Sequence, residues 1–250
     1  MKSFKTLSGN RPWIWAHRGA SAYAPENTME AFRLAHEMGA DGVEIDVYFS
    51  RDGQIVICHD EKMDRVSNGQ GSVTDYTVEE LKVFDFGCKF YGERRGIKIA
   101  TIDELYAFAH ETGLKINVEV KSASPDMPAA LIAKAREYDV EDLIYYSSFH
   151  HLQLVRLSAL DPSVRVAPLY SQVLVNMEDY AEKMGAWAVH PLFTIPMLTI
   201  PSLIEDCHKK GVLVNPWTAN NENDIRFCVE AGADGIISNY PDRVRAAIEE

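Results

Sequence analysis

The sequence predicts an α/β fold, a TIM (β/α)8 barrel with a small insertion after the second strand. The first observation is a junction that recurs along the chain, in which an amphipathic helix ends at a Gly and a short β-rich run follows. It appears as AHEMGADGVEIDV, HETGLKINVEV, AEKMGAWAVHPL, CHKKGVLVNPW and CVEAGADGIISNY. The Gly is the expected left-handed C-cap of each helix. Strands that alternate regularly with helices indicate a parallel sheet.

The second observation is the number of β-rich runs, which lie near residues 13–18, 43–48, 115–121, 143–149, 165–170, 187–192, 212–218 and 235–240. Eight βα repeats in a chain of 250 residues fit a TIM barrel better than an open doubly wound sheet. The G-x-G-x-x-G motif of dinucleotide-binding sheets is absent after the first run, where His-Arg-Gly-Ala-Ser stands instead.

Helices are expected between these runs, and three of their starts resemble capping boxes: Asn27-x-x-Glu30, Thr77-x-x-Glu80 and Thr101-x-x-Glu104. A ninth β-rich run, residues 55–59, follows close behind the second one. Residues 60–100 are too long for a βα loop and are rich in Gly, Asp and Tyr. We interpret them as an insertion over the barrel mouth, with one short helix near residues 78–85. No low-complexity linker divides the chain, so residues 1–250 are expected to form a single barrel domain.

Composition and charge argue against several classes of protein. The mean hydropathy of −0.18 and the absence of a run of about 18 apolar residues argue against a membrane-spanning protein. The first residues lack the apolar core of a signal peptide, so a cytoplasmic location is expected. Four scattered cysteines without a C-x-x-C motif suit reduced thiols and exclude a cysteine-rich zinc module. A net charge of −12 argues against nucleic acid as a partner.

Carboxylates gather at the ends of two predicted strands. Side chains alternate between the two faces of a strand, so Glu44 and Asp46 share one face of the run 43–48, and the aliphatic residues share the other. Glu119 points inward from the run 115–121 by the same argument. The carboxyl ends of barrel strands carry the active site in TIM-barrel enzymes. Three clustered hard oxygen ligands suit Mg²⁺ or Ca²⁺ rather than zinc.

Cations and imidazoles are predicted at the same end of the barrel. Arg18 and Lys121 provide donors suited to phosphate oxygens. His17 lies near the end of the first run, and His59 ends the run 55–59. The two are suited to act as a general base and a general acid near neutral pH. Metal ligands, cations and an acid–base pair at one place indicate phosphoester hydrolysis.

Each of these features, taken alone, also fits a structural role. Glu44-x-Asp46 can be a solvated or salt-bridged pair, Glu119-x-Lys121 a simple ion pair, and either histidine a packing residue. Trp217, at the end of the seventh run, fits either the core or an apolar wall for a substrate. The structural interpretation weakens because all these residues are expected to face inward together.

The ordered motifs resemble those of the glycerophosphodiester phosphodiesterases over nearly the whole chain. The matching residues are His17-Arg18-Gly19, Pro25-Glu26-Asn27-Thr28, Glu44-x-Asp46, Asp52-Gly53, His59-Asp60, Asn68-Gly69-x-Gly71, Glu119-x-Lys121, Ser148-Phe149, Trp217-Thr218 and Gly235-Ile236-Ile237 before Tyr240-Pro241. The resemblance implies a TIM barrel with a small insertion. It also implies hydrolysis of glycerophosphodiesters, such as glycerophosphocholine, to glycerol 3-phosphate and an alcohol.

The resemblance also implies a role for each site residue: His17 and His59 as the acid–base pair, Glu44, Asp46 and Glu119 as ligands of one Ca²⁺ or Mg²⁺, Arg18 and Lys121 on the phosphate, and Trp217 on the glycerol end. We assign His17 as base and His59 as acid, and the attacking group as water or the 2-hydroxyl of the glycerol. Two departures are visible, Asn239 where the family usually has Asp and a missing Pro near Ala100. Neither is expected to touch the chemistry.

Two alternatives stand beside this interpretation. One is lysophospholipase D-type cleavage of larger lysophospholipids, against which the polar stretch SNGQGSVTDY argues. The other is a non-catalytic barrel that binds phosphorylated ligands, which predicts a missing histidine or carboxylate, and none is missing. The expected partner is a small-molecule glycerophosphodiester, with no nucleic acid and no stable membrane insertion. A homodimer is compatible with these features.

Overall fold

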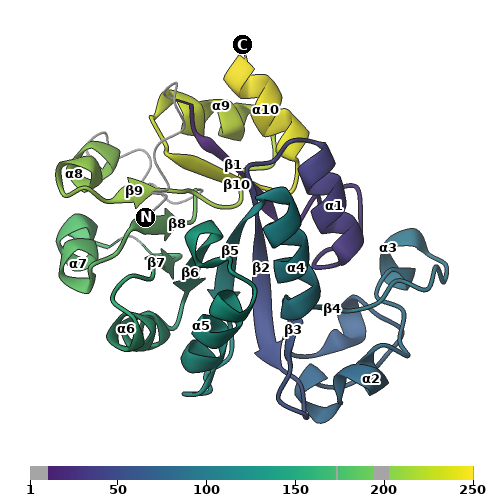
Figure 1. The fold of residues 1–250 in the computed structure, drawn as a ribbon. Coiled ribbons are helices and arrows are strands. Elements are labelled where there is room, and N and C mark those ends of the chain that lie inside the picture. Colours follow the sequence, from purple (N-terminus) through teal and green to yellow (C-terminus); the bar gives the residue numbers. More distant parts are fainter. Residues whose placement is uncertain (1–10, 173, 194–202, 250) are drawn as a thin grey trace.

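The computed structural model describes residues 11–172, 174–193 and 203–249, and within them the predicted barrel is confirmed (Figure 1). The parallel strands follow the order β10-β1-β2-β5-β6-β7-β8-β9. Their bounds are β1 Trp13–His17, β2 Gly42–Phe49, β5 Lys115–Val120, β6 Ile144–Ser148, β7 Val166–Tyr170, β8 Ala188–Pro191, β9 Leu213–Val214 and β10 Gly235–Ser238. The circle closes because the backbone N–H of Asp234 donates to Val214 O at 3.0 Å, and that of Ile237 to Pro216 O at 3.0 Å.

A helix follows each barrel strand and lies on the outside of the sheet (Figure 1). These helices are α1 Met29–Glu37, α4 Ile102–Thr112, α5 Met127–Glu137, α6 His151–Leu160, α7 Met177–Met184, α8 Leu203–Lys209, α9 Glu222–Glu230 and α10 Pro241–Glu249. The predicted Gly caps are found at the ends of α4 and α7. Gly113 and Gly185 are left-handed there, with φ of 75° and 69°.

Two of the three predicted capping boxes are confirmed, at Thr77 and Thr101. The third is wrong, because the N-cap of α1 is Thr28, whose hydroxyl accepts from the Ala31 N–H. Asn27 instead takes a left-handed conformation with φ of 57°, which Asn tolerates better than most residues. That conformation lets its side-chain amide donate to Asp46 Oδ2 at 2.9 Å.

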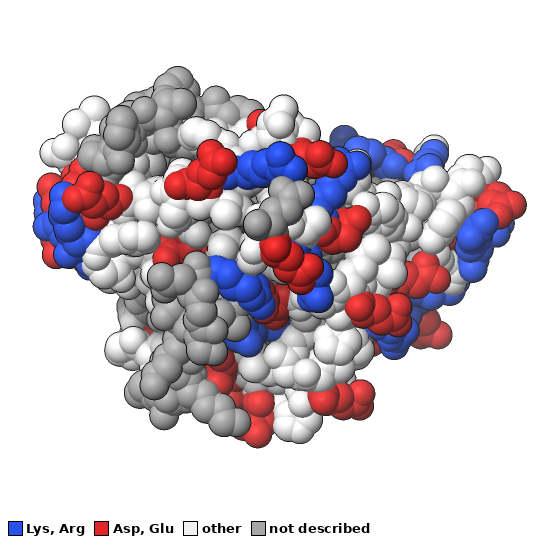
Figure 2. Space-filling model, turned by 90° about the horizontal axis from the view of Figure 1, so that it is seen from above, with Lys and Arg blue, Asp and Glu red and all other residues white. Residues whose placement is uncertain are grey.

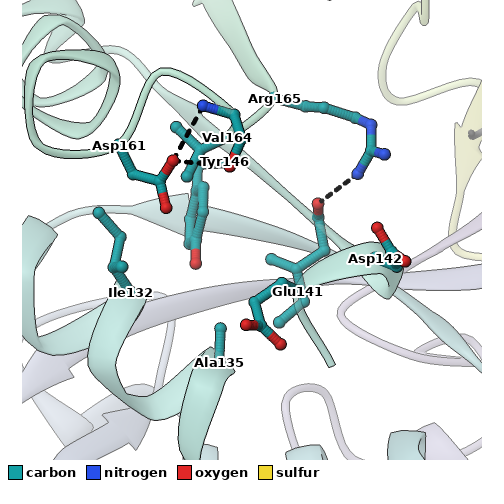
Figure 3. Close-up of a pocket in the computed structure, with 10 residues that line it drawn as sticks. Ile132, Ala135, Glu141, Asp142, Tyr146, Asp161, Val164 and Arg165 are labelled. Carbon is teal, nitrogen blue, oxygen red and sulfur yellow. Dashed lines mark hydrogen bonds between the residues drawn. The ribbon is translucent and has the colours of Figure 1, made fainter. Parts of the chain in front are cut away.

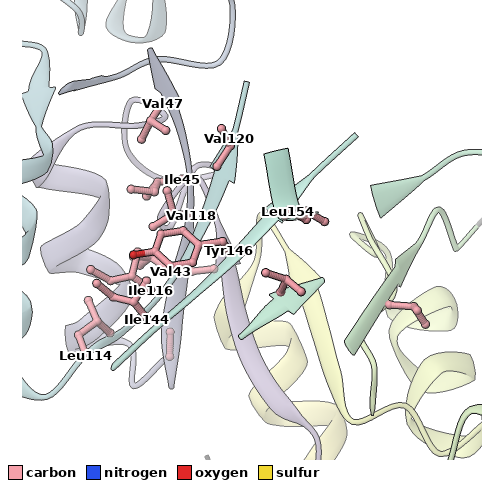
Figure 4. Packing of buried hydrophobic residues seen from close by; sticks show 14 of the residues in the cluster. Val43, Ile45, Val47, Leu114, Ile116, Val118, Val120, Ile144, Tyr146 and Leu154 are labelled. Carbon is pink, nitrogen blue, oxygen red and sulfur yellow. The ribbon is translucent and has the colours of Figure 1, made fainter. Parts of the chain in front are cut away.

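The alternation predicted along the strands is present. Val43, Ile45 and Val47 of β2 are buried and pack with the matching residues of β5 beneath the helices (Figure 4). Glu44 and Asp46 lie between them in the sequence and therefore face the barrel interior. The interior also holds an apolar cluster of Trp13, Trp15, Tyr145, Ala167, Ala188 and Ile237. Since Trp15 and Tyr145 pack edge to face at 4.9 Å, this part of the barrel is filled.

The insertion leaves the barrel at the end of β2 and lies beside it (Figure 1). The run near residues 55–59 forms β3 Ile55–Ile57, which pairs antiparallel with β2 and with β4 Ala100–Thr101. Between them lie four short helices, η1 Met63–Arg65, η2 Val73–Asp75, α2 Val78–Leu81 and α3 Cys88–Tyr91. The predicted helix near residues 78–85 is thus shorter than expected. The insertion has its own core: Val56, Cys58, Met63, Val73, Leu81, Phe86 and Ile99.

One carboxylate ties distant parts of the insertion together. Asp85 is buried and accepts the backbone N–H groups of Gly87 at 2.8 Å, Arg95 at 2.7 Å and Gly96 at 2.6 Å. Desolvation works to raise the pKa of Asp85, but the backbone donors outweigh it and lower the pKa.

Replacing Asp85 with Ala is expected to destabilise the protein. The buried N–H of Gly87 and the part-buried N–H groups of Arg95 and Gly96 lose a charged acceptor. We therefore expect a loss of about 2 kcal/mol in the free energy of unfolding, measured by urea denaturation at pH 7. Because the pKa is lowered on folding, this contribution is present above the unfolded pKa and disappears as the pH falls through the folded one. Asp64→Ala removes an exposed carboxylate that accepts one N–H, from Gly71, and is the control. Equal unfolding midpoints for D85A and the wild type would contradict the role of Asp85.

Candidate active site

The carboxylates come together because of the strand register. His17 pairs with Glu44 across β1 and β2, and Asp46 pairs with Glu119 across β2 and β5. Glu44, Asp46 and Glu119 are all buried, and each contributes an oxygen to a group whose atoms lie within 4.8 Å of one another. Strand pairing alone therefore brings the three predicted metal ligands together.

The three carboxylates shift one another's pKa values because they are buried and close together. Burial, together with the neighbouring carboxylates, raises the pKa of Glu44 well above its usual value and that of Glu119 to about 7. Asp46 behaves differently: burial opposes ionisation, but nearby positive groups, above all Arg18, outweigh it and lower the pKa. One oxygen of this fully buried side chain, Oδ1, accepts no hydrogen bond from any described residue. Three buried carboxylates with an unsatisfied oxygen fit a hard divalent cation such as Ca²⁺ or Mg²⁺.

Both predicted histidines present the same ring nitrogen to the cluster. His17 Nδ1 lies 2.6 Å from Asn239 Oδ1, and His59 Nδ1 lies 2.7 Å from Asp60 Oδ1. These oxygens can only accept, so each Nδ1 carries the proton. Nε2 of His17 then faces Glu44 at 3.9 Å, and Nε2 of His59 faces Lys121 Nζ at 3.3 Å.

Burial lowers the pKa of both rings. Desolvation and the neighbouring Arg18 lower the pKa of His17 to about 4, against the hydrogen bond to Asn239. Desolvation also lowers the pKa of His59, and Arg18 and Lys121 add to it, while the carboxylates of Asp46 and Asp60 work against it. The lowered pKa favours the neutral ring for both histidines, and in that form Nε2 is the acceptor nitrogen.

The two predicted cations lie against the same carboxylates. Arg18 has a left-handed backbone with φ of 57°. Its Nη1 donates to Glu26 Oε1 at 3.0 Å, and its Nε lies 3.5 Å from Asp46 Oδ2. Lys121 Nζ lies 3.0 Å from Glu119 Oε1 and 3.7 Å from Asp46 Oδ1.

Gly19 allows the chain to turn directly after Arg18. Its φ is 81°, and a Cβ there would lie 2.7 Å from Ala31 of α1. The position therefore requires glycine, and this requirement explains why the first strand ends in His-Arg-Gly.

A pocket opens over these groups, lined by His17, Arg18, Glu44, His59, Asn117, Glu119, Lys121, Ser147, Phe149, Leu169, Trp217 and Ile237. Seven of the eight predicted site residues thus line one pocket, and the eighth, Asp46, is buried behind it. Trp217 is held by an Nε1 hydrogen bond to His190 O at 2.8 Å, and its ring packs edge to face on Phe149 at 5.5 Å. The two rings belong to the lining of the same pocket as the charged groups.

A second pocket lies at the other end of the strands (Figure 3). Its lining includes Glu141 and Asp142, which precede β6, and Arg165, which precedes β7. None of the predicted site residues lines it. The chemistry therefore concentrates in the pocket at the carboxyl ends of the strands.

Sequence reasoning missed part of the surroundings of the two histidines. Asn239 was expected not to touch the chemistry, but it contacts His17 directly, so that expectation is wrong. The alternation along the last strand (Gly235, Ile237, Asn239) was the available signal, since it sends Asn239 inward. Arg65 was not singled out at all.

Comparisons with known proteins agree with this geometry. Residues 17–243 match the model of the glycerophosphoryl diester phosphodiesterase family. The chain belongs to this family. The resemblance inferred from the ordered motifs is therefore confirmed.

Family members align with nearly the whole chain. A glycerophosphodiester phosphodiesterase of Caldanaerobacter subterraneus is 39% identical over 232 residues, which cover 92% of this chain and 94% of the relative. One from Bacillus altitudinis is 34% identical and covers 95% and 98%. A phosphodiesterase of Oleispira antarctica, solved in complex with the product sn-glycerol-3-phosphate, superposes with a TM-score of 0.89 at 29% identity, over 96% of this chain and 98% of that one.

Among the described residues, no helix combines the length and the apolar character needed to cross a membrane. Figure 2 shows basic and acidic side chains interspersed over the face seen from above. In a protein whose formal net charge is −12, Arg18 and Lys121 bring two positive groups into the pocket.

Binding of a divalent cation is expected to stabilise the protein. At 100 times its dissociation constant, Ca²⁺ or Mg²⁺ should add about 2.7 kcal/mol, seen as a rise in melting temperature after chelator-treated protein is titrated. Glu119→Gln should abolish this rise while leaving the cation-free melting temperature equal or higher, because one of three repelling acids is neutralised. Glu80→Gln, on an exposed carboxylate of the insertion, should keep the full rise. An undiminished rise in E119Q would rule out this carboxylate cluster as the binding site.

Proposed function

We propose that this protein is a metal-dependent glycerophosphodiester phosphodiesterase that hydrolyses its substrate to sn-glycerol 3-phosphate and an alcohol. The observation that carries the proposal is a single pocket in which two imidazoles, two cationic side chains and two buried carboxylates meet, with the third carboxylate, Asp46, in the same cluster. Membership of the family and the product bound in the Oleispira antarctica relative support the same substrate class.

Glu44, Asp46 and Glu119 would hold one Ca²⁺ or Mg²⁺. When bound, such an ion supplies Lewis-acid polarisation and a template for substrate oxygens. Neutralising the three acids also removes the repulsion that raises the pKa of Glu44 and Glu119.

Arg18 and Lys121 would bind the phosphate. Both lie on the pocket surface, and each is held by carboxylates on one side, which leaves its other donors for the substrate. Preorganised cations of this kind stabilise the negative charge that builds on the phosphoryl oxygens in the transition state.

The partners of the two histidines suggest their roles. A carboxylate, Asp60, stands behind His59 and stabilises its protonated form, whereas a neutral amide, Asn239, stands behind His17. His17 would therefore take the proton from the attacking oxygen. His59 would act from its doubly protonated form, which Asp60 stabilises, and would give its Nε2 proton to the leaving alkoxide. If water attacks, glycerol 3-phosphate forms directly. If the glycerol 2-hydroxyl attacks, a cyclic phosphate forms first and water then opens it.

Trp217 and Phe149 would contact the carbon skeleton of the glycerol. A small polar head group fits the proposal better than a lysophospholipid, because the insertion next to the site has the polar stretch SNGQGSVTDY. We further propose that residues 1–250 act as one barrel domain. We also propose that the protein works in the cytoplasm, where its four unpaired cysteines stay reduced.

Loss of either histidine is expected to reduce turnover by about 10²- to 10⁴-fold, the usual contribution of a general acid or base. The assay incubates glycerophosphocholine with the enzyme and couples glycerol 3-phosphate to its dehydrogenase, with and without chelator. Chelation should remove the activity, and added Ca²⁺ or Mg²⁺ should restore it. His110→Ala, on the exposed side of α4, should remain as active as the wild type. Near-normal turnover of H17A or H59A would contradict the two-histidine scheme.

The leaving group separates the roles of the two histidines. With a p-nitrophenyl diester, the leaving group is p-nitrophenolate, which needs no proton to leave, so His59→Ala should lose far less activity on it than on glycerophosphocholine. His17→Ala should lose about the same activity on both substrates. The reverse pattern would exchange the assignments of acid and base.

A further inference from the structure

Arg65 connects the two sides of the site through a side chain that no step of the mechanism uses. It lies at the end of η1 in the insertion, and its Nε donates to Asp60 Oδ2 at 2.6 Å. Its Nη1 and Nη2 donate to the two carboxylate oxygens of Glu26, each at 2.8 Å. All three guanidinium nitrogens are therefore engaged with residues next to the site.

Each carboxylate that Arg65 holds is also bound to a proposed functional group. The second oxygen of Asp60 accepts from His59 Nδ1 at 2.7 Å. Glu26 Oε1 also accepts from Arg18 Nη1 at 3.0 Å. A continuous chain of charge-assisted hydrogen bonds therefore runs from His59 through Asp60, Arg65 and Glu26 to Arg18.

The core of the insertion fixes the backbone position of Arg65. Met63, two residues before it, is fully buried in the core of the insertion. The side chain of Arg65 is 48% exposed, so the ion pairs contribute little to overall stability by themselves. Their geometry has a more specific consequence, because a planar guanidinium can hold two carboxylates at fixed angles and a lysine ammonium cannot.

We propose that Arg65 is a positioning residue for the reaction. It fixes Asp60 so that His59 keeps its proton on Nδ1 and its Nε2 toward the pocket, and it fixes Glu26 so that Arg18 keeps its place at the phosphate. The insertion thereby supports both the acid and one phosphate ligand. The expected effect on kcat rests on the proposed function, whereas the expected effect on the His59 tautomer does not.

The kinetic test compares Arg65→Gln and Arg65→Lys with Arg51→Gln. Arg51 lies at the edge of the same insertion and makes a similar fork, from Nη2 to both oxygens of Glu80 at 2.9 and 2.8 Å, without touching the site. For R65Q we expect kcat to fall about 10- to 100-fold, the usual cost of losing a partner behind a functional histidine, with a smaller change in KM. R65K, which can keep one carboxylate at a time, should lie between R65Q and the wild type. R51Q should keep the kcat of the wild type.

A double variant tests whether Arg65 acts through Asp60. If it does, R65Q should lower kcat by a smaller factor in the Asp60→Asn background than in the wild type, because D60N has already broken one of the two links that Arg65 makes. Effects that multiply would overturn the chain from Arg65 to His59.

The decisive readout is independent of turnover. Long-range ¹H–¹⁵N NMR of the histidine rings, on protein whose fold is checked by its melting temperature, should show His59 as the Nδ1–H tautomer in the wild type and R51Q, and as a mixture of tautomers in R65Q. An unchanged tautomer together with wild-type kcat in R65Q would overturn the proposal. If the wild type itself cleaves no glycerophosphodiester, the proposed function fails, and the tautomer comparison still decides whether Arg65 positions His59.

Discussion

Three buried carboxylates that share one small space are the constraint on which the rest of the site depends. Strand register puts Glu44, Asp46 and Glu119 together, and like charges out of water are costly unless cations or hydrogen bonds compensate. Arg18 and Lys121 supply part of that compensation from neighbouring strand ends, and Asn27 adds a hydrogen bond. The raised pKa of Glu44 and Glu119 shows that the protein alone leaves the compensation incomplete. A divalent cation is the simplest group to complete it.

The barrel and the insertion supply different groups around this carboxylate cluster. The barrel strands supply the three carboxylates, whose backbones are held by the sheet, and Lys121 directly follows β5. His59 and Arg18 lie where the chain leaves the sheet, so their side chains depend on partners outside it. Those partners are Asp60 and Glu26, and both are held by the insertion through Arg65. A segment outside the repeated βα pattern thus holds the partners of His59 and Arg18.

Sequence patterns were informative wherever a local rule decides the structure. Period-two alternation correctly turned Glu44, Asp46 and Glu119 inward, and the Thr-x-x-Glu spacing correctly marked the starts of α2 and α4. The capping-box prediction was wrong at Asn27-x-x-Glu30, because the side chain of Asn27 makes a tertiary hydrogen bond to Asp46 in place of the local cap. Asn239 lies 222 positions from His17 along the chain, and only closure of the barrel brings the two together. The role of Arg65 could not be predicted for a similar reason, since its partners come from two separate loops.

The aromatic packing inside the barrel decides how molecules move through the site. Trp15 and Tyr145 fill the interior beneath the carboxylates, so a molecule in the pocket has no route onward through the barrel axis. Substrate entry and the exit of both products then share one opening. The fragment bound deeper, against the charged floor, leaves after the one nearer the rim. In the proposed reaction, with the phosphate over Arg18 and Lys121, the released alcohol would depart first and the phosphorylated product last, and that product would compete with the next substrate for the same place.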